Sequence, residues 1–266
     1  MIKRESIIVA IIAGLLLLSC SGFEKIMKSK DYDYKYTKAL EFMVRGDYYH
    51  ATLLFEQLQP IYNGTQRSDS VEYYLALGNY HQGDFLLAGH YFDKFRKTYP
   101  RSVFTEEAEY MYAYCYFESS PRSELDQDNT QAAIAAFSEF LSKYPQSSHK
   151  AEVIDILENL RNKLIEKSYL SAKLYYDIGE YKAAIVSIKN SLKDFPMSKY
   201  REEQLFLILK SSFLLADNSV PQKKKERFQS AVDEYYTLIG EYPETQYLKE
   251  AKRMYEQSMK ALGTKQ

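Results

Sequence analysis

Residues 83–102 read GDFLLAGHYFDKFRKTYPRS, and this stretch decides the fold. Gly83 opens it, Ala88 and Phe92 follow at helical spacing, and Pro100 closes it. Glycine admits the left-handed backbone of a tight turn between antiparallel helices. Alanine lets two helices approach closely, and proline ends a helix because it has no amide proton and clashes with the preceding turn. The stretch therefore predicts a turn followed by the second helix of a helical hairpin.

The same pattern recurs along the chain. Four near-identical tetrapeptides carry the proline: Tyr99-Pro100-Arg101-Ser102, Tyr144-Pro145-Gln146-Ser147, Phe195-Pro196-Met197-Ser198 and Tyr242-Pro243-Glu244-Thr245. An alanine stands 12 residues before each proline and an aromatic residue or isoleucine stands eight before it: Ala88, Ala133, Ala184, Ala231, and Phe92, Phe137, Ile188, Tyr235. Gly46 starts a fifth copy, in which Asn63 replaces the expected proline and Pro60 lies three positions early.

This register resembles the second half of a tetratricopeptide repeat. The segment before each turn fits the first helix of such a hairpin, because alanine stands seven residues before the turn glycine at Ala39, Ala76 and Ala172. Each hairpin of such an array buries its apolar face only against its neighbours. We therefore predict an all-α fold, an α-solenoid of about five tetratricopeptide-like helix hairpins.

Successive prolines are 45, 51 and 47 residues apart, whereas a minimal repeat has about 34 residues. Two polar stretches that contain proline, Glu118 to Asn129 and Asp217 to Glu226, predict lengthened turns inside the third and fifth hairpins. The stretch from Ser148 to Ile178 has neither proline nor glycine and keeps an apolar period near 3.6. It predicts one long helix that joins repeats three and four.

The N-terminus has the layout of an exported precursor. Lys3 and Arg4 precede an apolar stretch from Ile7 to Leu18, which is shorter than the roughly 20 residues that span a bilayer. The sequence Leu17-Leu18-Ser19-Cys20 resembles the bacterial lipobox, in which the cysteine is acylated and becomes the first residue after cleavage. We predict lipid attachment at Cys20 and, because serine follows it, an address on the periplasmic face of the outer membrane. The alternative is an ordinary signal peptide with a chance cysteine.

These features predict a division of the chain. Residues 1–19 are the lipoprotein signal peptide and residues 20–31 the lipidated N-terminal tether. Residues 32–147 hold repeats 1–3, and residues 148–266 hold the long linking helix and repeats 4–5.

Composition excludes several classes of function. The formal net charge is −1 and becomes −2 without residues 1–19, which carry two cations and one carboxylate, so there is no electrostatic footprint for nucleic acid. Once Cys20 is acylated, Cys115 is the one thiol left, and its apolar helical context is typical of a buried small hydrophobe. The histidines show no metal-ligand spacing, and no phosphate loop or serine elbow is present. We predict no catalytic residues, no metal and no cofactor.

Repeat arrays of this kind bind extended peptides or partner domains along the first helices of their hairpins. The repeat pattern places six residues of the first two hairpins on that face: Tyr36, Leu40, Met43, Tyr73, Leu77 and Tyr80. We predict Tyr36, Met43, Tyr73, Leu77 and Tyr80 as peptide- or partner-binding residues, because amphipathic rings make adaptable anchors. The alternative is that these rings are core, as most of the 26 tyrosines and 14 phenylalanines must be in such a solenoid.

The lipobox, the repeats that start near Gly46, Gly83 and Asp128, the inserted loop in the third repeat and the long linking helix together resemble the BamD family. That family consists of lipoprotein subunits of the β-barrel assembly machine of the outer membrane. The resemblance implies a non-enzymatic scaffold that binds a BamA-like barrel insertase with its C-terminal repeats and works beside other assembly-machine lipoproteins. It also implies that unfolded outer-membrane proteins meet the N-terminal groove. Asn63, in place of proline, departs from the pattern.

A second hypothesis is a different periplasmic repeat lipoprotein, such as a pilotin-like protein or a coordinator of envelope constriction and division. A hidden hydrolase is a third, and it lacks a nucleophile, base and orienting group at usable spacing. The phenotype of depletion separates the first two, since loss of barrel proteins points to assembly and a pilus or division defect to the alternative.

Overall fold

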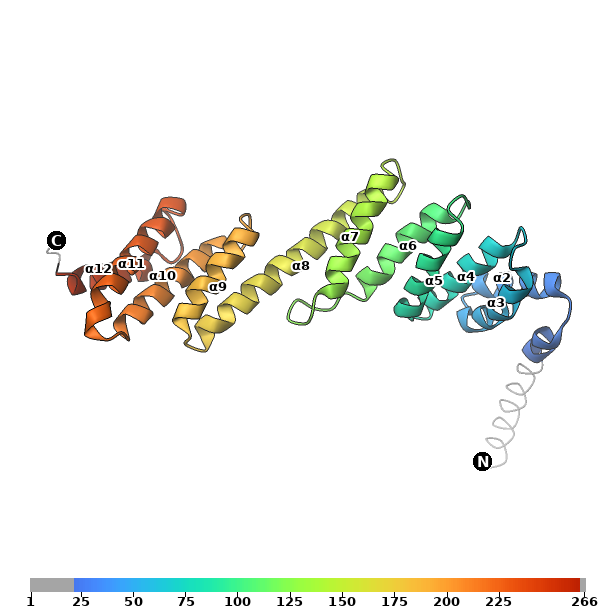
Figure 1. The fold of residues 1–266 in the computed structure, drawn as a ribbon, viewed down its shortest axis with the longest axis horizontal. Coiled ribbons are helices and arrows are strands. Elements are labelled where there is room, and N and C mark those ends of the chain that lie inside the picture. Colours follow the sequence, from blue (N-terminus) through green and yellow to red (C-terminus); the bar gives the residue numbers. More distant parts are fainter. Residues whose placement is uncertain (1–21, 264–266) are drawn as a thin grey trace, which may run out of the picture. The chain divides into compact units, whose positions relative to one another are not determined.

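The computed structural model describes residues 22–263, and its regular structure there is entirely helical. Residues 22–28 form a short helix ahead of the first hairpin. The remaining helices follow in chain order (Figure 1): α2 (Tyr32–Val44), α3 (Tyr48–Tyr62), α4 (Ser68–His81), α5 (Phe85–Thr98), α6 (Thr105–Glu118), α7 (Asp128–Lys143), α8 (Lys150–Asp177), α9 (Tyr181–Asp194), α10 (Arg201–Asp217), α11 (Pro221–Glu241) and α12 (Leu248–Ala261).

Consecutive helices pair into the predicted hairpins, which are α2/α3, α4/α5, α6/α7, α8/α9 and α10/α11. Within the first three, each helix packs against the next one along the chain, from α2 to α7. The predicted all-α solenoid is confirmed. Helix α12, which the repeat pattern did not predict, packs against α10 and α11 and covers the last hairpin.

The turn glycines have the predicted left-handed backbone, with φ of 76° at Gly46 and 82° at both Gly83 and Gly179. The following aspartate caps the next helix in the first two hairpins. The carboxylate of Asp84 accepts a hydrogen bond from the Leu87 N–H at 3.1 Å, and Asp47 makes the equivalent contact with the His50 N–H. A glycine that ends one helix and an aspartate that starts the next thus reverse the chain in two residues.

The repeated alanines have no exposed surface at any of the five predicted positions: Ala51, Ala88, Ala133, Ala184 and Ala231. The prolines end their helices as predicted, since α5 stops at Thr98 and α11 stops at Glu241, each two residues before a proline. Pro60 does not end α3, which continues to Tyr62 with Asn63 as its C-cap. Pro60 lies two residues before the end of α3, so the hydrogen bond that it cannot donate and its clash with the preceding turn disturb only the last turn of the helix.

The sequence predicted three departures from the minimal repeat, which are two lengthened turns and one long helix. The first lengthened turn and the long helix have the predicted extent. Helix α6 ends at Glu118 and α7 starts at Asp128, which leaves a long turn, and α8 is one helix of 28 residues. The predicted loop from Asp217 to Glu226 is wrong in extent, because α11 begins at Pro221 and includes the lysine run that follows. Proline suits the first helical position, where its missing amide proton would have no intrahelical partner.

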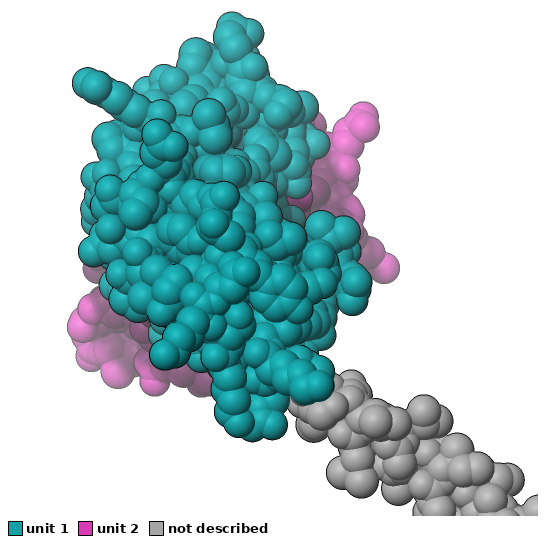
Figure 2. Space-filling model, turned by 90° about the vertical axis from the view of Figure 1, so that its right-hand side faces the viewer, with its two compact units in different colours: residues 1–121, 128–157 teal, residues 122–127, 158–266 magenta. Residues whose placement is uncertain are grey.

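The chain forms two compact units, shown in two colours in Figure 2. Unit 1 comprises residues 1–121 and 128–157, and unit 2 comprises residues 122–127 and 158–266. The division falls inside α8, ten residues beyond the predicted repeat boundary after residue 147, and the predicted domain scheme stays a prediction. The predicted signal peptide and Cys20 lie outside the described residues.

Cys115 is buried in α6, as its apolar context predicts. Burial, assisted by the nearby Glu118 carboxylate, raises the pKa of the thiol to about 12. A thiol with so high a pKa holds almost no thiolate at neutral pH, so Cys115 acts as a core side chain.

Candidate binding surface

Each hairpin carries on its first helix a ring that stacks against the residue directly before the helix that follows the hairpin. In unit 1, Tyr73 stacks on Phe104 with ring centroids 4.6 Å apart and planes 15° apart, and Tyr110 stacks on His149 at 3.9 Å and 12°. In the first hairpin the Arg67 guanidinium takes the place of a ring, 5.1 Å from the centroid of Tyr36.

Unit 2 repeats the arrangement twice. Tyr169 stacks on Tyr200, and Phe206 stacks on Tyr247, both at 4.2 Å and 7°. We call these five contacts the stacking ladder; its pairs are Tyr36/Arg67, Tyr73/Phe104, Tyr110/His149, Tyr169/Tyr200 and Phe206/Tyr247.

The end of the repeated tetrapeptide places the second member of every pair. In each copy a serine or threonine hydroxyl accepts a hydrogen bond from the backbone N–H two residues later. Ser198 accepts from the Tyr200 N–H at 3.1 Å, and Thr65 accepts from the Arg67 N–H at 3.3 Å. The other three acceptors are Ser102, Ser147 and Thr245. The second member of each pair then stands directly before the next helix. We call this hydroxyl-to-N–H contact the hydroxyl turn; it orients the side chain of the second member toward the preceding hairpin.

The predicted binding residues of the first hairpin lie on α2. Tyr36 is half-buried, and its hydroxyl donates a hydrogen bond to the Ser70 Oγ at 3.0 Å. Met43 approaches α4 closely, with its Sδ 3.7 Å from the point where a Cβ on Gly78 would lie. The same Cβ would lie 2.5 Å from the Thr52 Oγ1, so only glycine fits at this crossing of helices.

The predicted residues of the second hairpin lie on α4 and differ in exposure. Tyr73 is only 7% exposed, and burial raises its pKa well above the usual value. Tyr80 and Leu77 are half-buried. Tyr80 meets Tyr114 of α6 edge to face at 6.1 Å, and burial, more than any neighbouring charge, raises its pKa to about 12.

Sequence reasoning missed the acidic rim beside these rings. The His149 Nε2 lies 2.9 Å from a Glu107 carboxylate oxygen, and its Nδ1 lies 3.7 Å from Glu152. Burial, followed by the Glu152 carboxylate, raises the pKa of Tyr110. The fourth position after the proline of each repeated tetrapeptide, where an aromatic residue or histidine always stands, is the signal that could have revealed the ladder.

This face of unit 1 therefore combines deeply buried ladder rings with half-buried ones. Tyr36, Met43, Leu77 and Tyr80 keep part of their surface free, whereas the Tyr73 ring is enclosed among the rings of Phe92, Phe95 and Phe104. Partly exposed amphipathic side chains suit apolar and aromatic side chains of an extended peptide. Over residues 22–263 no three histidine, cysteine or acidic side chains converge in a way that could hold a metal ion.

The same range of the chain contains no helix with the length and apolar character required to cross a lipid bilayer.

Comparison with known proteins assigns the chain to a family. The family model YfiO, described as an outer membrane lipoprotein, matches residues 28–226. The chain is 22% identical over 218 residues to the outer membrane protein assembly factor BamD of Caulobacter vibrioides, covering 79% of this chain and 70% of that one. It is 21% identical over 262 residues to the BamD of Neisseria meningitidis serogroup B, covering 92% and 94% of the two chains.

Among solved structures, the TPR2AB-domain:pHSP90 complex of yeast Sti1 aligns with 85% of this chain and 98% of that chain. With a TM-score of 0.40 and an identity of 12%, the likeness is distant. The family model, by contrast, covers well over half of the sequence. The chain belongs to the BamD (YfiO) family of outer membrane lipoproteins.

Proposed function

We propose that this protein is a scaffold that helps to assemble and insert β-barrel proteins into the outer membrane. The observation that carries the proposal is the family match over residues 28–226, together with relatives that are named outer membrane protein assembly factors. Those names favour barrel assembly over the alternative of a pilotin-like or division-coordinating lipoprotein. The role needs surfaces and no reaction centre, so we propose no enzymatic activity.

The proposed scaffold is held by acyl chains on Cys20 and faces the periplasm. The description of the family as a lipoprotein family supports the anchor. Two residues after Cys20 the chain enters the helix of residues 22–28, which packs on the first hairpin through Phe23, Ile26 and Met27. An anchor at Cys20 would therefore act on a folded part of unit 1.

We assign two binding roles. Unit 2, with the C-terminal repeats, binds a BamA-like insertase and other lipoproteins of the assembly machine. The half-buried side chains of unit 1, Tyr36, Met43, Leu77 and Tyr80, contact unfolded barrel precursors. Tyr73 then serves as a positioning residue, because its stack on Phe104 holds α4 beside the start of α6.

Pull-down of the lipidated protein from solubilised outer membranes tests the role itself. A large β-barrel protein should co-purify, and its absence from the captured material would refute the proposal.

Photocrosslinking tests the assignment of the two surfaces. A photoreactive residue at Tyr80 should capture unfolded barrel precursors. A matched probe at Tyr236, which is 58% exposed on α11, should capture none of them. Precursors captured equally from both positions would contradict a binding surface on unit 1.

A further inference from the structure

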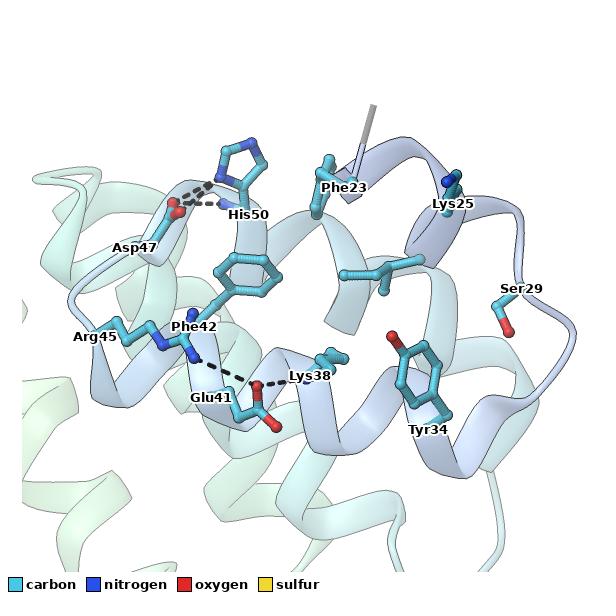
Figure 3. Close-up of a pocket in the computed structure, with 12 residues that line it drawn as sticks. Phe23, Lys25, Ser29, Tyr34, Lys38, Glu41, Phe42, Arg45, Asp47 and His50 are labelled. Atoms are coloured by element: carbon cyan, nitrogen blue, oxygen red, sulfur yellow. Dashed lines mark hydrogen bonds and ion pairs between the residues drawn. The ribbon is translucent and has the colours of Figure 1, made fainter. Parts of the chain in front are cut away.

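A cavity of about 540 Å³ lies between residues 22–29, α2 and the start of α3. Figure 3 shows Phe23 standing beside Phe42 and His50 on one side, and Tyr34, Lys38, Glu41 and Arg45 along α2 on the other. The volume lies within the range of small-molecule sites, about 300–1,000 Å³. All of these residues belong to unit 1.

A buried lysine links the segments that surround the cavity. Lys35 is 4% exposed, and its Nζ donates to the Met27 carbonyl at 2.9 Å and to the Gln57 Oε1 at 2.7 Å. These bonds tie residues 22–28 to α2 and α3, since an unpartnered buried ammonium would be costly. Phe23 in turn lies 4.1 Å from the His50 ring and 5.7 Å from the Phe42 ring, centroid to centroid. The cavity is therefore preformed and partly apolar.

The polar lining carries both signs of charge. The Lys38 Nζ lies 2.7 Å and the Arg45 Nη2 lies 3.7 Å from the same Glu41 oxygen, so two cations share one carboxylate. Lys25 adds a third cation and Asp47 a second carboxylate, which contacts His50 at 2.7 Å. A ligand with one phosphate and one ammonium group complements this set, since the cations can bind the phosphate and Glu41 the amine.

The cavity lies close to Cys20 along the chain, and this position indicates that the ligand is a membrane lipid. Gly22 lines the cavity, and two extended residues span at most about 7 Å, so an acylated Cys20 would lie within that reach of the cavity edge. The headgroup layer of a bilayer is itself about 5–8 Å thick. An anchor at Cys20 would therefore place this cavity in the headgroup layer.

We propose that this cavity binds the headgroup of a phospholipid that carries a phosphate and a primary amine, of the phosphatidylethanolamine class. Lys38 and Arg45 hold the phosphate, Glu41 holds the ammonium group, and Phe23 with Phe42 contacts the glycerol end. Together with the acyl anchor, the bound lipid sets the orientation of unit 1 on the membrane. The inference rests on the anchor at Cys20 in the proposed function.

The test uses the full-length lipidated protein in vesicles of phosphatidylethanolamine, phosphatidylcholine or phosphatidylglycerol. Native mass spectrometry after mild extraction counts the phospholipid that stays bound without a covalent link. The wild-type protein should retain one phosphatidylethanolamine, and less of the two other lipids, which lack either the primary amine or any cation.

The pocket variant is Lys38→Gln/Arg45→Gln, and the matched control is Lys28→Gln/Lys30→Gln. The control removes two cations from the same membrane-proximal region, and neither of them lines the cavity. The pocket variant should bind about 30-fold more weakly, because it loses two charge-assisted contacts to the phosphate, whereas the control keeps both contacts and should bind as the wild type does. Helicity and melting temperature should match the wild type in both variants.

Three lipid-binding results would each overturn the inference: no retained lipid on the wild-type protein, equal weakening in both variants, or equal retention of phosphatidylglycerol, which indicates attraction by surface charge alone. The intact mass of the same sample reports acylation, and an unacylated Cys20 also overturns it. A barrel partner recovered from that sample tests the proposed function separately. Loss of the partner with lipid retained refutes the scaffold role, and the converse refutes the lipid site.

Discussion

The stacking ladder differs between the two units. In unit 2 both steps are ring on ring, nearly parallel, with Tyr200 and Tyr247 as the second members. In unit 1 the second members are Arg67, Phe104 and His149, and two of these also bond to carboxylates, Arg67 to Asp33 and His149 to Glu107. The repeat thus determines where a flat group stands, while its chemistry varies.

This difference indicates that one unit of the repeat array contributes mainly to stability, while the other keeps side chains partly exposed for recognition. Helix α10 in unit 2 is buried around most of its circumference, between α9, α11 and α12. Helices α2 and α4 of unit 1 keep half-buried tyrosines on one side. We expect unit 2 to depend on apolar burial, and unit 1 to depend more on ion pairs at its ladder.

The largest effect is expected for Phe206→Ala, which removes a ladder ring that is 5% exposed. The free energy of unfolding of unit 2 should fall by about 3 kcal/mol, the usual cost of deleting a buried phenyl ring. Hydrogen exchange should speed up in α10 and α12 and stay unchanged in α4.

The counterpart in unit 1 is Tyr36→Ala. Because Tyr36 is half-buried and faces a cation, its loss should cost about 1–2 kcal/mol. Equal losses in the two variants, measured by urea unfolding with exchange as a local probe, would remove the contrast between the units.

A smaller effect is expected for Ser198→Ala, which removes the hydroxyl that accepts the Tyr200 N–H at 3.1 Å. Loss of one hydrogen bond should lower the unfolding free energy by about 1 kcal/mol. Ser230→Ala, at an exposed site on α11, serves as the control and should change stability very little. Should both variants be neutral, the hydroxyl turn does not help to position the ladder.

Arg67→Gln tests the ionic character of unit 1. The guanidinium faces the rings of Tyr36 and Tyr62 and pairs with Asp33 at an exposed site, so its loss should lower the free energy of unfolding only slightly. The difference from the wild type should shrink at 1 M salt, where charges are screened beyond about 3 Å. A difference that is independent of salt would indicate that only the flat shape of the side chain matters.

The smallest effect is the pH dependence of stability that arises from the ion pair between Arg201 and Glu241. The Arg201 guanidinium bonds both oxygens of Glu241, at 2.7 and 2.8 Å, and lowers the pKa of that carboxyl below its ordinary 4.5. A depressed folded pKa gives stability that is present above the unfolded value and lost as the pH falls through the folded one. Wild-type unit 2 should therefore weaken slightly below pH 4.5, and Glu241→Gln should abolish that part of the pH dependence. If the free energy of unfolding of the variant falls below pH 4.5 as steeply as that of the wild type, this role of Glu241 is contradicted.

Much of the fold follows from local patterns. The turn glycines, the closely packed alanines and the helix-ending prolines recur at constant offsets, and each acts through its own backbone or nearest neighbours. That is why the hairpins and the long helix α8 could be predicted from single residues. Pro221 was misread for a related reason, because proline both ends helices and starts them, and its neighbours did not distinguish the two uses.

The candidate surface was less accessible to sequence reasoning. Tyr36, Tyr73 and Tyr80 share a residue type and a predicted face, yet Tyr73 is almost enclosed whereas Tyr36 and Tyr80 are half-buried. The difference depends on which side chain arrives from the next hairpin, 31 residues later in the case of Phe104.

By itself, then, the sequence determined that this chain forms stacked helical hairpins, because helix stops, turns and close helix contacts are decided by residues near each other in the chain. Only the tertiary structure decided which rings are enclosed in the ladder, that Lys35 reaches the Met27 carbonyl, and that a cavity of mixed charge lies beside the N-terminal segment. Those features join residues of different helices, and their energies come from burial and pairing that exist only after the hairpins have packed.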